Sequence, residues 1–208
     1  MNNGHVQIPC AAVRPLEPVL YSWIACTHRY VDIWDGNDLP YWYNEQANVS
    51  ILAGAAWKAD WTAIEEYQIN KVATEASENA SLIGRNDLYV ADDNHGFCIE
   101  AKVAYVPINN VPYARDRIIE RCRLAKADAL RVDYHDPKLG AVFIAPYSPG
   151  CVATPGQILE FAKMLQTLPH DALAWACPID AQKTPSHDNK HYPMIALLLV
   201  NAETSKQS

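Results

Sequence analysis

Two short runs of alternating side chains, separated by a polar turn, constrain the fold of this chain more than any other feature. The runs cover residues 85–91 and 97–103, and in both of them hydrophobic and polar side chains alternate with a period of two. That period is typical of β-strands. Residues 92–96, with the sequence Asp-Asp-Asn-His-Gly, have the composition of a turn. The stretch therefore predicts a β-hairpin.

The predicted hairpin collects charged side chains on one face. Glu100 and Lys102 lie two positions apart, so their side chains project from the same side of the strand. With Ala91 opposite Cys98, Asp87 falls opposite Lys102 and shares that face. An odd number of loop residues would turn Asp87 to the other face unless a bulge restored the pairing. We expect two carboxylates and one amine to meet there.

The rest of the chain predicts an α/β protein. We expect helices at residues 19–33, 41–57, 112–132 and 154–168, and further strands at residues 61–72, 140–147, 172–177 and 194–200. A polar linker at residues 74–81 precedes the hairpin. The chain has 208 residues, of which 50% are hydrophobic, and this is ample for a single well-buried domain.

Asp87, the hairpin and the tripeptide Glu100-Ala101-Lys102 resemble the motif of the PD-(D/E)xK nuclease superfamily, which includes type II restriction enzymes and junction resolvases. Asn86 stands where the family usually has proline. The order of elements over residues 41–147 is also similar to the αβββαβ core of that family. The resemblance implies a restriction endonuclease-like fold, in which helices flank a central mixed sheet, with an N-terminal helical extension and an extra C-terminal helix and strands.

The resemblance also implies how residues 1–208 are divided within one domain. Residues 1–40 would be an N-terminal accessory segment, and residues 41–147 would be the nuclease-like core. Residues 148–200 would extend the core at its C-terminal side. Apart from the resemblance, we expect residues 201–208 to form a flexible tail.

A mechanism follows from the same resemblance. Asp87 and Glu100, with the main-chain carbonyl that follows Glu100, would offer hard oxygen ligands to Mg²⁺ or Mn²⁺. The ion would polarise the scissile phosphate and lower the pKa of a bound water. Lys102 would position that water or help to deprotonate it. Glu45, at the start of the second helix, would hold a second metal or a metal-bound water, although Glu66 could take this role instead.

Each of these residues also has a purely structural interpretation. Asp87, Glu100 and Lys102 could form a cross-strand salt bridge on a solvated sheet face. Glu45 could simply favour the positive N-terminus of its helix. The strand context and the order of elements favour the metal site.

The net charge of −7 argues against a general nucleic-acid coat, but the charge is unevenly spread. Residues 112–131 hold six basic and three acidic side chains and are the only positive segment. In the superfamily this helix packs beside the motif strands, so Arg115, Arg117 and Arg121 could reach a backbone phosphate. The alternative is a solvated helix face on which the acidic residues 116, 120 and 128 pair with the arginines.

The function that these expectations favour is a metal-dependent nuclease that hydrolyses phosphodiester bonds of nucleic acid, with DNA as the favoured substrate. The alternative is a catalytically silent nuclease-fold protein that acts as a binding or assembly subunit. Its acidic surface would then face a protein partner or a second copy of the chain. A metal-dependent enzyme that acts on a small substrate with the same residues is a third class.

No stretch predicts a membrane segment or an export signal. The longest apolar run, residues 194–200, is far shorter than the roughly 20 residues that cross a bilayer, and the first residues lack a basic head followed by an apolar core. The six cysteines include no Cys-x-x-Cys pair, which is typical of reduced thiols. Cys177, His187 and His191 fit a loop with solvated histidines better than a zinc site. We expect a cytoplasmic protein.

Overall fold

A computed structural model describes residues 4–72 and 81–203 of the chain, with the backbone alone for Ser81 and Leu82. The strands are β1 (Gly4–Gln7), β2 (Thr62–Val72), β3 (Ser81–Ala91), β4 (Gly96–Pro107), β5 (Lys138–Pro149), β6 (Ala172–Ala176), β7 (Lys190–His191) and β8 (Ile195–Asn201). The helices are α1 (Glu17–Ile33), α2 (Glu45–Lys58), α3 (Val111–Leu130) and α4 (Pro155–Gln166), with short 3-10 helices η1 (Ala11–Leu16) and η2 (Pro40–Trp42).

The strands form one sheet in the order β1-β6-β8-β5-β4-β3-β2, and β7 pairs with β5 outside this path. Strands β4 and β5 are parallel and are joined through α3, whereas all other pairs are antiparallel. The expectation of an α/β protein with a central mixed sheet flanked by helices is confirmed.

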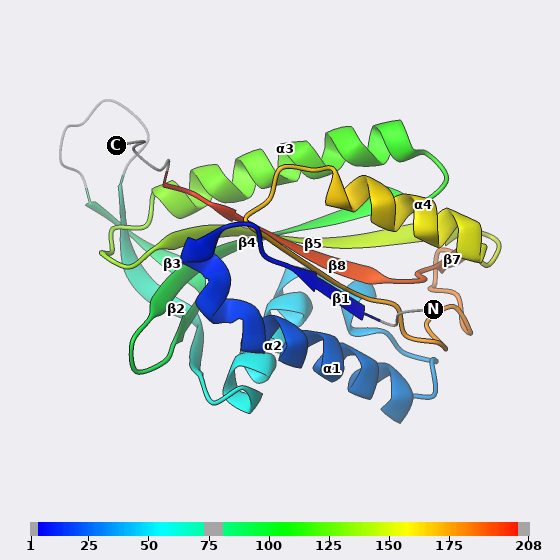
Figure 1. The fold of residues 1–208 in the computed structure, drawn as a ribbon, viewed down its shortest axis with the longest axis horizontal. Coiled ribbons are helices and arrows are strands. Elements are labelled where there is room, and N and C mark those ends of the chain that lie inside the picture. The colour runs from blue at the N-terminus through cyan, green and yellow to red at the C-terminus, as the bar shows by residue number, and fades with distance from the viewer. Residues whose placement is uncertain (1–3, 73–80, 204–208) are drawn as a thin grey trace.

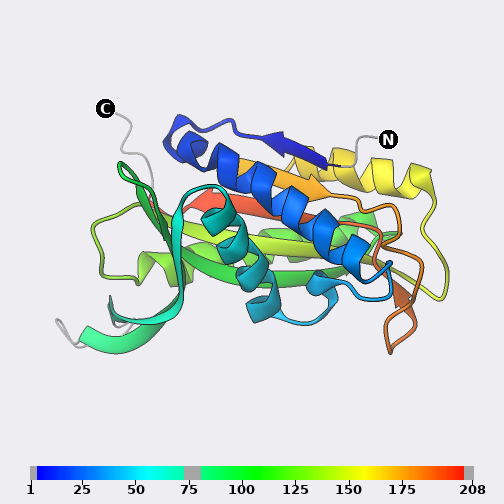
Figure 2. The same ribbon diagram turned by 90° about the horizontal axis from the view of Figure 1, so that it is seen from below.

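The sheet is covered on both faces, with α3 and α4 on one side and α1 and α2 on the other (Figure 1). Figure 2 shows α1 and α2 running across the second face. Along β5, Phe143 packs in the core beneath α1 and α2, while its neighbour Val142 packs in the core beneath α3 and α4. Coverage on both faces explains why β5 and β8 read as continuous apolar runs.

Side-chain caps mark the beginning of α2, α3 and α4. Asn44 Oδ1 accepts a hydrogen bond from the main-chain nitrogen of Ala47 at 2.9 Å, and Asn110 and Thr154 cap α3 and α4 in the same way. The helix expected from residue 41 therefore begins at Glu45, because the residues before the Asn44 cap form the 3-10 helix η2.

Two polar segments of the sequence lie partly outside the described residues. Ser81, the last residue of the expected linker 74–81, belongs to β3, and residues 74–80 are not described. Asn201, the first residue of the expected tail, belongs to β8, and residues 204–208 are not described. Among the described helices, none combines the length and the hydrophobicity of a bilayer-spanning helix.

The hairpin of β3 and β4 forms with a register that differs from the expected one by two residues. Ala91 lies opposite Gly96 instead of Cys98, and the pairing ends at Leu88 and Ile99. A shift of two leaves every side chain on its expected face. Beyond Ile99, β4 continues beside β5, and within the described chain no strand pairs with its other edge. The position where β3 leaves β4 is the position of Asp87.

Candidate active site at the parting of β3 and β4

Asp87 lies where the two strands of the hairpin separate. Its Oδ2 accepts a hydrogen bond from the main-chain nitrogen of Ala101 at 2.7 Å, so the side chain replaces a backbone partner of β4. Burial raises the pKa of Asp87, while this hydrogen bond and the charges of Lys102 and Lys71 oppose the shift. The carboxylate therefore lies beside the Glu100-Ala101-Lys102 segment, as the sequence predicts.

Glu100 is the most deeply buried carboxylate of the site, with only 3% of the residue exposed. Its Oε1 lies 2.6 Å from the Nζ of Lys71 on β2. Burial raises the pKa of Glu100 to about 7, against the effect of the Lys71 ion pair, and the negative charge of Asp87 adds to the rise. Two acidic groups thus share a poorly solvated position, and a cation bound between them would relieve this cost.

Lys71 reaches Glu100 because Gly84 leaves a passage over β3. A Cβ atom at Gly84 would lie 2.9 Å from Cδ and 3.1 Å from Cγ of Lys71, so a larger residue would obstruct the lysine stem. The end of β2 is also tied to the loop after α3, since Val72 N donates to Arg131 O at 2.8 Å. The sequence analysis missed Lys71, and the one signal that could have indicated it is a glycine within a strand pattern.

Lys102 points toward α3. Its Nζ lies 2.9 Å from Oδ2 of Asp128 and donates to the carbonyl of Ala101 at 2.8 Å. Burial works against the charged amine, but the Asp128 hydrogen bond and the charges of Glu45 and Asp87 raise the pKa of Lys102. Lys102 is therefore held as a cation. The alternative in which Asp128 pairs with arginines along its own helix does not describe this residue, because the helix turns it toward β4.

Glu45 occupies the first turn of α2 and is half-buried. Burial raises its pKa, and the charges that act on it most strongly are those of Lys102 and Asp87, followed by Arg121 and Asp128. Its carboxylate is therefore within electrostatic range of both the hairpin and α3.

Glu66 is oriented differently. It forms an ion pair with Arg85 at 3.4 Å, and its charge is the weakest of the effects that shift the pKa of Asp87. Glu45 is thus coupled to Lys102 and Asp87, whereas Glu66 acts on Asp87.

The three arginines of α3 that were expected to reach phosphate face different surroundings. The positive charge of Arg121 lowers the pKa of Glu45, although burial raises it overall. The buried Nε of Arg121 has no hydrogen-bond partner among the described residues. Arg115 instead donates to Oγ1 of Thr167 at 3.1 Å, which links α3 to the end of α4. The pKa of Glu120 is lowered mainly by its hydrogen bond to Arg123, and the charges of Arg117 and Arg121 add smaller effects in the same direction. Only Arg121 of the three is shown to be coupled to the site.

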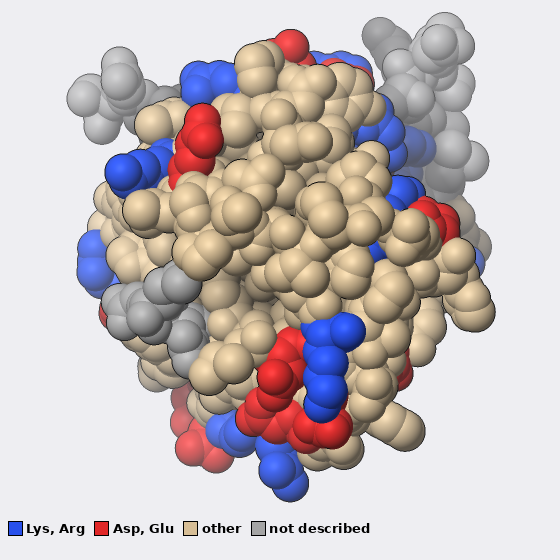
Figure 3. Space-filling model, turned by 90° about the vertical axis from the view of Figure 1, so that its right-hand side faces the viewer, with Lys and Arg blue, Asp and Glu red and all other residues tan. Residues whose placement is uncertain are grey.

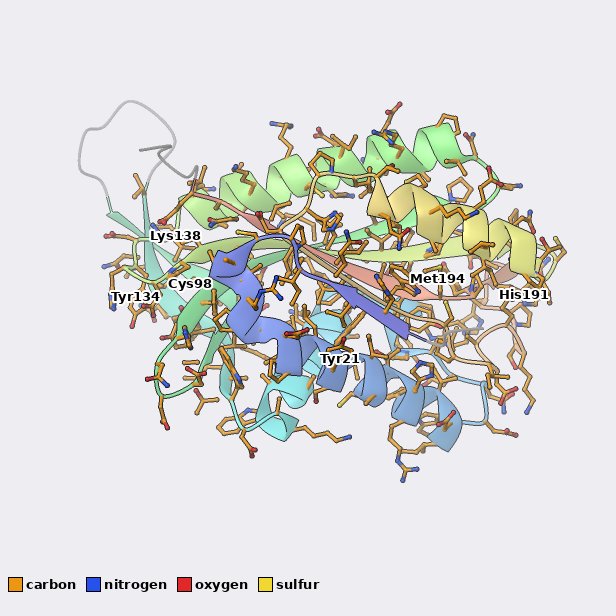
Figure 4. The ribbon with its side chains drawn as sticks, in the orientation of Figure 1. Tyr21, Cys98, Tyr134, Lys138, His191 and Met194 are labelled. Carbon is orange, nitrogen blue, oxygen red and sulfur yellow. The ribbon has the colours of Figure 1, made fainter. Side chains whose placement is uncertain are left out.

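Tyrosine side chains close the hairpin end of the site. Tyr67 lies 3.8 Å from Sγ of Cys98, and Tyr89 donates to Asp136 at 2.7 Å. Figure 4 shows Cys98 near Tyr134 at this end of the molecule, far from His191. Burial raises the pKa of Cys98 to about 11, even though the Tyr67 hydrogen bond opposes the shift, so the thiol stays protonated and is a poor nucleophile.

The donor chemistry of the site fits a hard divalent cation. Asp87 and Glu100 each use one carboxylate oxygen in the contacts described above, and Ala101, which follows Glu100 in the chain, adds a main-chain carbonyl. Such oxygen ligands suit Mg²⁺ or Mn²⁺. In the described part of the chain, however, no three His, Cys, Asp or Glu side chains are already gathered as a metal-ligand group. An ion that binds the Oε1 of Glu100 would have to displace Lys71.

Comparisons of the chain with protein-family models, with curated proteins and with solved structures find no match, so the candidate site is defined by its own geometry.

Proposed function

We propose that this protein is a metal-dependent nuclease with a restriction endonuclease-like core, and that it hydrolyses phosphodiester bonds of DNA. The observation that carries the proposal is the position of Asp87 at the parting of the hairpin, hydrogen-bonded to the segment that holds Glu100 and Lys102. The parallel pairing of β4 with β5 through α3, after the meander β2-β3-β4, supports the same core.

In this proposal Asp87 and Glu100, with the carbonyl of Ala101, hold Mg²⁺ or Mn²⁺. The bound ion would polarise the scissile phosphate and lower the pKa of an attacking water. The raised pKa values of both carboxyl groups support the assignment, because a cation favours the charged forms that burial disfavours. Lys71 is then the counter-ion that Glu100 uses before the metal binds.

Lys102 acts as a hydrogen-bond donor in this mechanism. Its raised pKa keeps the amine protonated at neutral pH, so it does not suit the role of a base that removes a proton from water. It instead donates hydrogen bonds that orient the water or stabilise charge on the phosphate. Asp128 holds the amine in position. Glu45, on the other side of Lys102, is the helper carboxylate.

The experiment is a cleavage assay on a DNA plasmid and on labelled oligonucleotides, with Mg²⁺, Mn²⁺ or a chelator. Asp87→Ala should lose both cleavage and metal binding, whereas Lys102→Ala should bind Mn²⁺ within a few-fold of wild type but cleave at least about 100-fold more slowly. Asp93→Asn, an exposed acidic residue in the turn of the same hairpin, is the matched control. Equal cleavage rates for wild type and Lys102→Ala would refute the assignment.

A second candidate is a catalytically silent nuclease-fold subunit that binds a protein partner or a second copy of the chain. Two ion pairs, Lys71–Glu100 and Lys102–Asp128, favour it. Each of them gives a charged group of the site a partner of opposite charge within the chain. Complete absence of cleavage with every metal, together with a dimer in sedimentation experiments, would favour this candidate.

A further inference from the structure

A pocket of about 660 Å³ opens where β4 ends and the segment around β7 packs against η2. Its volume is in the range of small-molecule and nucleotide sites. Figure 1 places β7 at the right-hand end of the molecule, and Figure 3 views that end, whose central surface carries few charged side chains. The side chains that determine the chemistry of the pocket are Trp42, Tyr43, Tyr105, His187, Lys190 and Tyr192.

The pocket is aromatic and nearly neutral. Tyr105 and Tyr192 meet edge to face with ring centroids 6.3 Å apart. Tyr43 is 57% exposed at the rim. The charge of Lys190 is already used, because its Nζ forms an ion pair with Asp188 and lies 4.6 Å above the ring of Tyr147. Such a lining suits a flat, uncharged, hydrogen-bonding ligand better than it suits a phosphate chain.

Tyr105 connects this pocket to the candidate active site. It follows Lys102 by three residues on β4, so the two side chains project from opposite faces of the sheet, but both lie along the edge that no described strand covers. Burial raises the pKa of Tyr105, and the charge of Glu45 adds to the rise, so Glu45 influences both the pocket and the hairpin site. The buried hydroxyl of Tyr105 has no hydrogen-bond partner among the described residues. A ligand in the pocket could supply that partner.

We infer that the pocket binds the base of an unpaired nucleotide a few nucleotides along the same strand from the phosphate held at Asp87 and Glu100, so that the substrate includes a single-stranded segment. The inference rests on the proposed nuclease function. A base offers the flat, uncharged surface that stacks on tyrosine and tryptophan rings. A base within a duplex is stacked and paired on both sides, so it could not enter unless it left the helix. The phosphates would remain outside, near the metal and Arg121.

The test compares Tyr43→Ala with Tyr21→Ala, an equally exposed tyrosine on α1 outside the pocket, which is 55% exposed. Anisotropy titrations with Ca²⁺ in place of Mg²⁺ would use labelled oligothymidylate and a duplex of the same length. Tyr43→Ala should weaken single-strand binding about tenfold and duplex binding less than twofold, since stacking on one ring is lost. Tyr43→Phe, which keeps the ring, and Tyr21→Ala should bind oligothymidylate within about twofold of wild type.

The outcomes separate the inference from the function on which it rests. If wild type cleaves DNA with Mg²⁺ and Tyr43→Ala binds oligothymidylate normally, the pocket inference fails and the nuclease proposal stands. Equal losses for single strands and duplexes would also overturn it, because the effect would then not be specific for unpaired bases. If wild type binds neither oligonucleotide, both proposals fail. Circular dichroism and thermal unfolding would confirm that each variant is folded.

Discussion

The Nζ of Lys71 lies 2.6 Å from the Oε1 of Glu100, although β3 separates their two strands in the sheet. A lysine amine thus occupies one oxygen of a carboxylate that the proposed mechanism assigns to a metal ion. The amine and the ion therefore compete for Glu100.

Replacing Lys71 with Met should separate the effects of this competition. The Kd for Mn²⁺, measured by calorimetry at pH 8, should decrease, because no amine has to leave Glu100 before the ion binds. The metal-free variant should be less stable than wild type by about 3 kcal/mol, since removing one partner of a buried ion pair leaves the other charge unpaired. Lys58→Met, at an exposed lysine near the end of α2, is the control. Weaker Mn²⁺ binding by Lys71→Met would mean that Lys71 supports the ion instead of competing with it.

Gly84→Ala should disturb the same ion pair without removing either charge. The new methyl group would lie 2.9 Å from Cδ of Lys71, so the lysine stem has to move. We expect a loss of stability smaller than that of Lys71→Met, together with tighter Mn²⁺ binding than wild type. Gly54→Ala, at a helical glycine with no neighbour within 4 Å of the added carbon, should instead stabilise the protein by up to about 1 kcal/mol. Urea unfolding in a chelator measures the stability of both variants. Equal effects of the two substitutions would contradict the claim that Gly84 leaves room for the Lys71 side chain.

The pKa of Glu100 predicts how stability depends on pH. Its folded-state pKa of about 7 lies above the ordinary value of 4.5, so the folded protein binds the proton more tightly than the unfolded chain does. Stability from this group is therefore fully present below about pH 4.5 and is lost as the pH rises to about 7 and above. In a chelator, wild type should lose about 3 kcal/mol more than Glu100→Gln between pH 4.5 and pH 8. Mg²⁺ should reduce that loss for wild type alone. Parallel curves of stability against pH for the two proteins would contradict the raised pKa of Glu100.

Arg121 should contribute more to DNA binding than Arg115 does. Arg121 is coupled to Glu45 and has an Nε with no hydrogen-bond partner among the described residues, whereas Arg115 binds Thr167 at the end of α4. Arg121→Gln should weaken binding and reduce the slope of log K against log salt by about one, as expected when one phosphate contact is lost. Arg115→Gln should change neither. Titrations at several salt concentrations with Ca²⁺ provide the measurement, and identical slopes for both variants would place the phosphates elsewhere.

The sequence predicts much of this arrangement because strands alternate with a period of two. That period determines the face on which Asp87, Glu100 and Lys102 lie, and the face is the same in the expected register and in the observed one. It does not determine the register itself. The turn sets the register, and here it closes with Ala91 opposite Gly96.

The residues that the sequence analysis missed are those whose roles depend on contacts between distant elements. Lys71 is on a strand that does not pair with β4, and Asp128 is on a helix where its neighbours in sequence suggest pairing with arginines. No local pattern distinguishes these two residues from ordinary surface charges. The short strands β1 and β7 were missed for a related reason, since segments of this length carry too little alternation to be read as strands.

Because β3 leaves β4 at Asp87, the two proposed metal ligands belong to separately supported parts of the molecule. Glu100 is fixed in the middle of the sheet, whereas Asp87 is carried by the two-stranded ribbon of β2 and β3. The far end of that ribbon is anchored where Val72 and Asn70 bond with residues 131 and 133. The ribbon is therefore held at two places, by its pairing with β4 near the turn of the hairpin and by its hydrogen bonds to the loop after α3. The separation of the two carboxylates depends on both attachments.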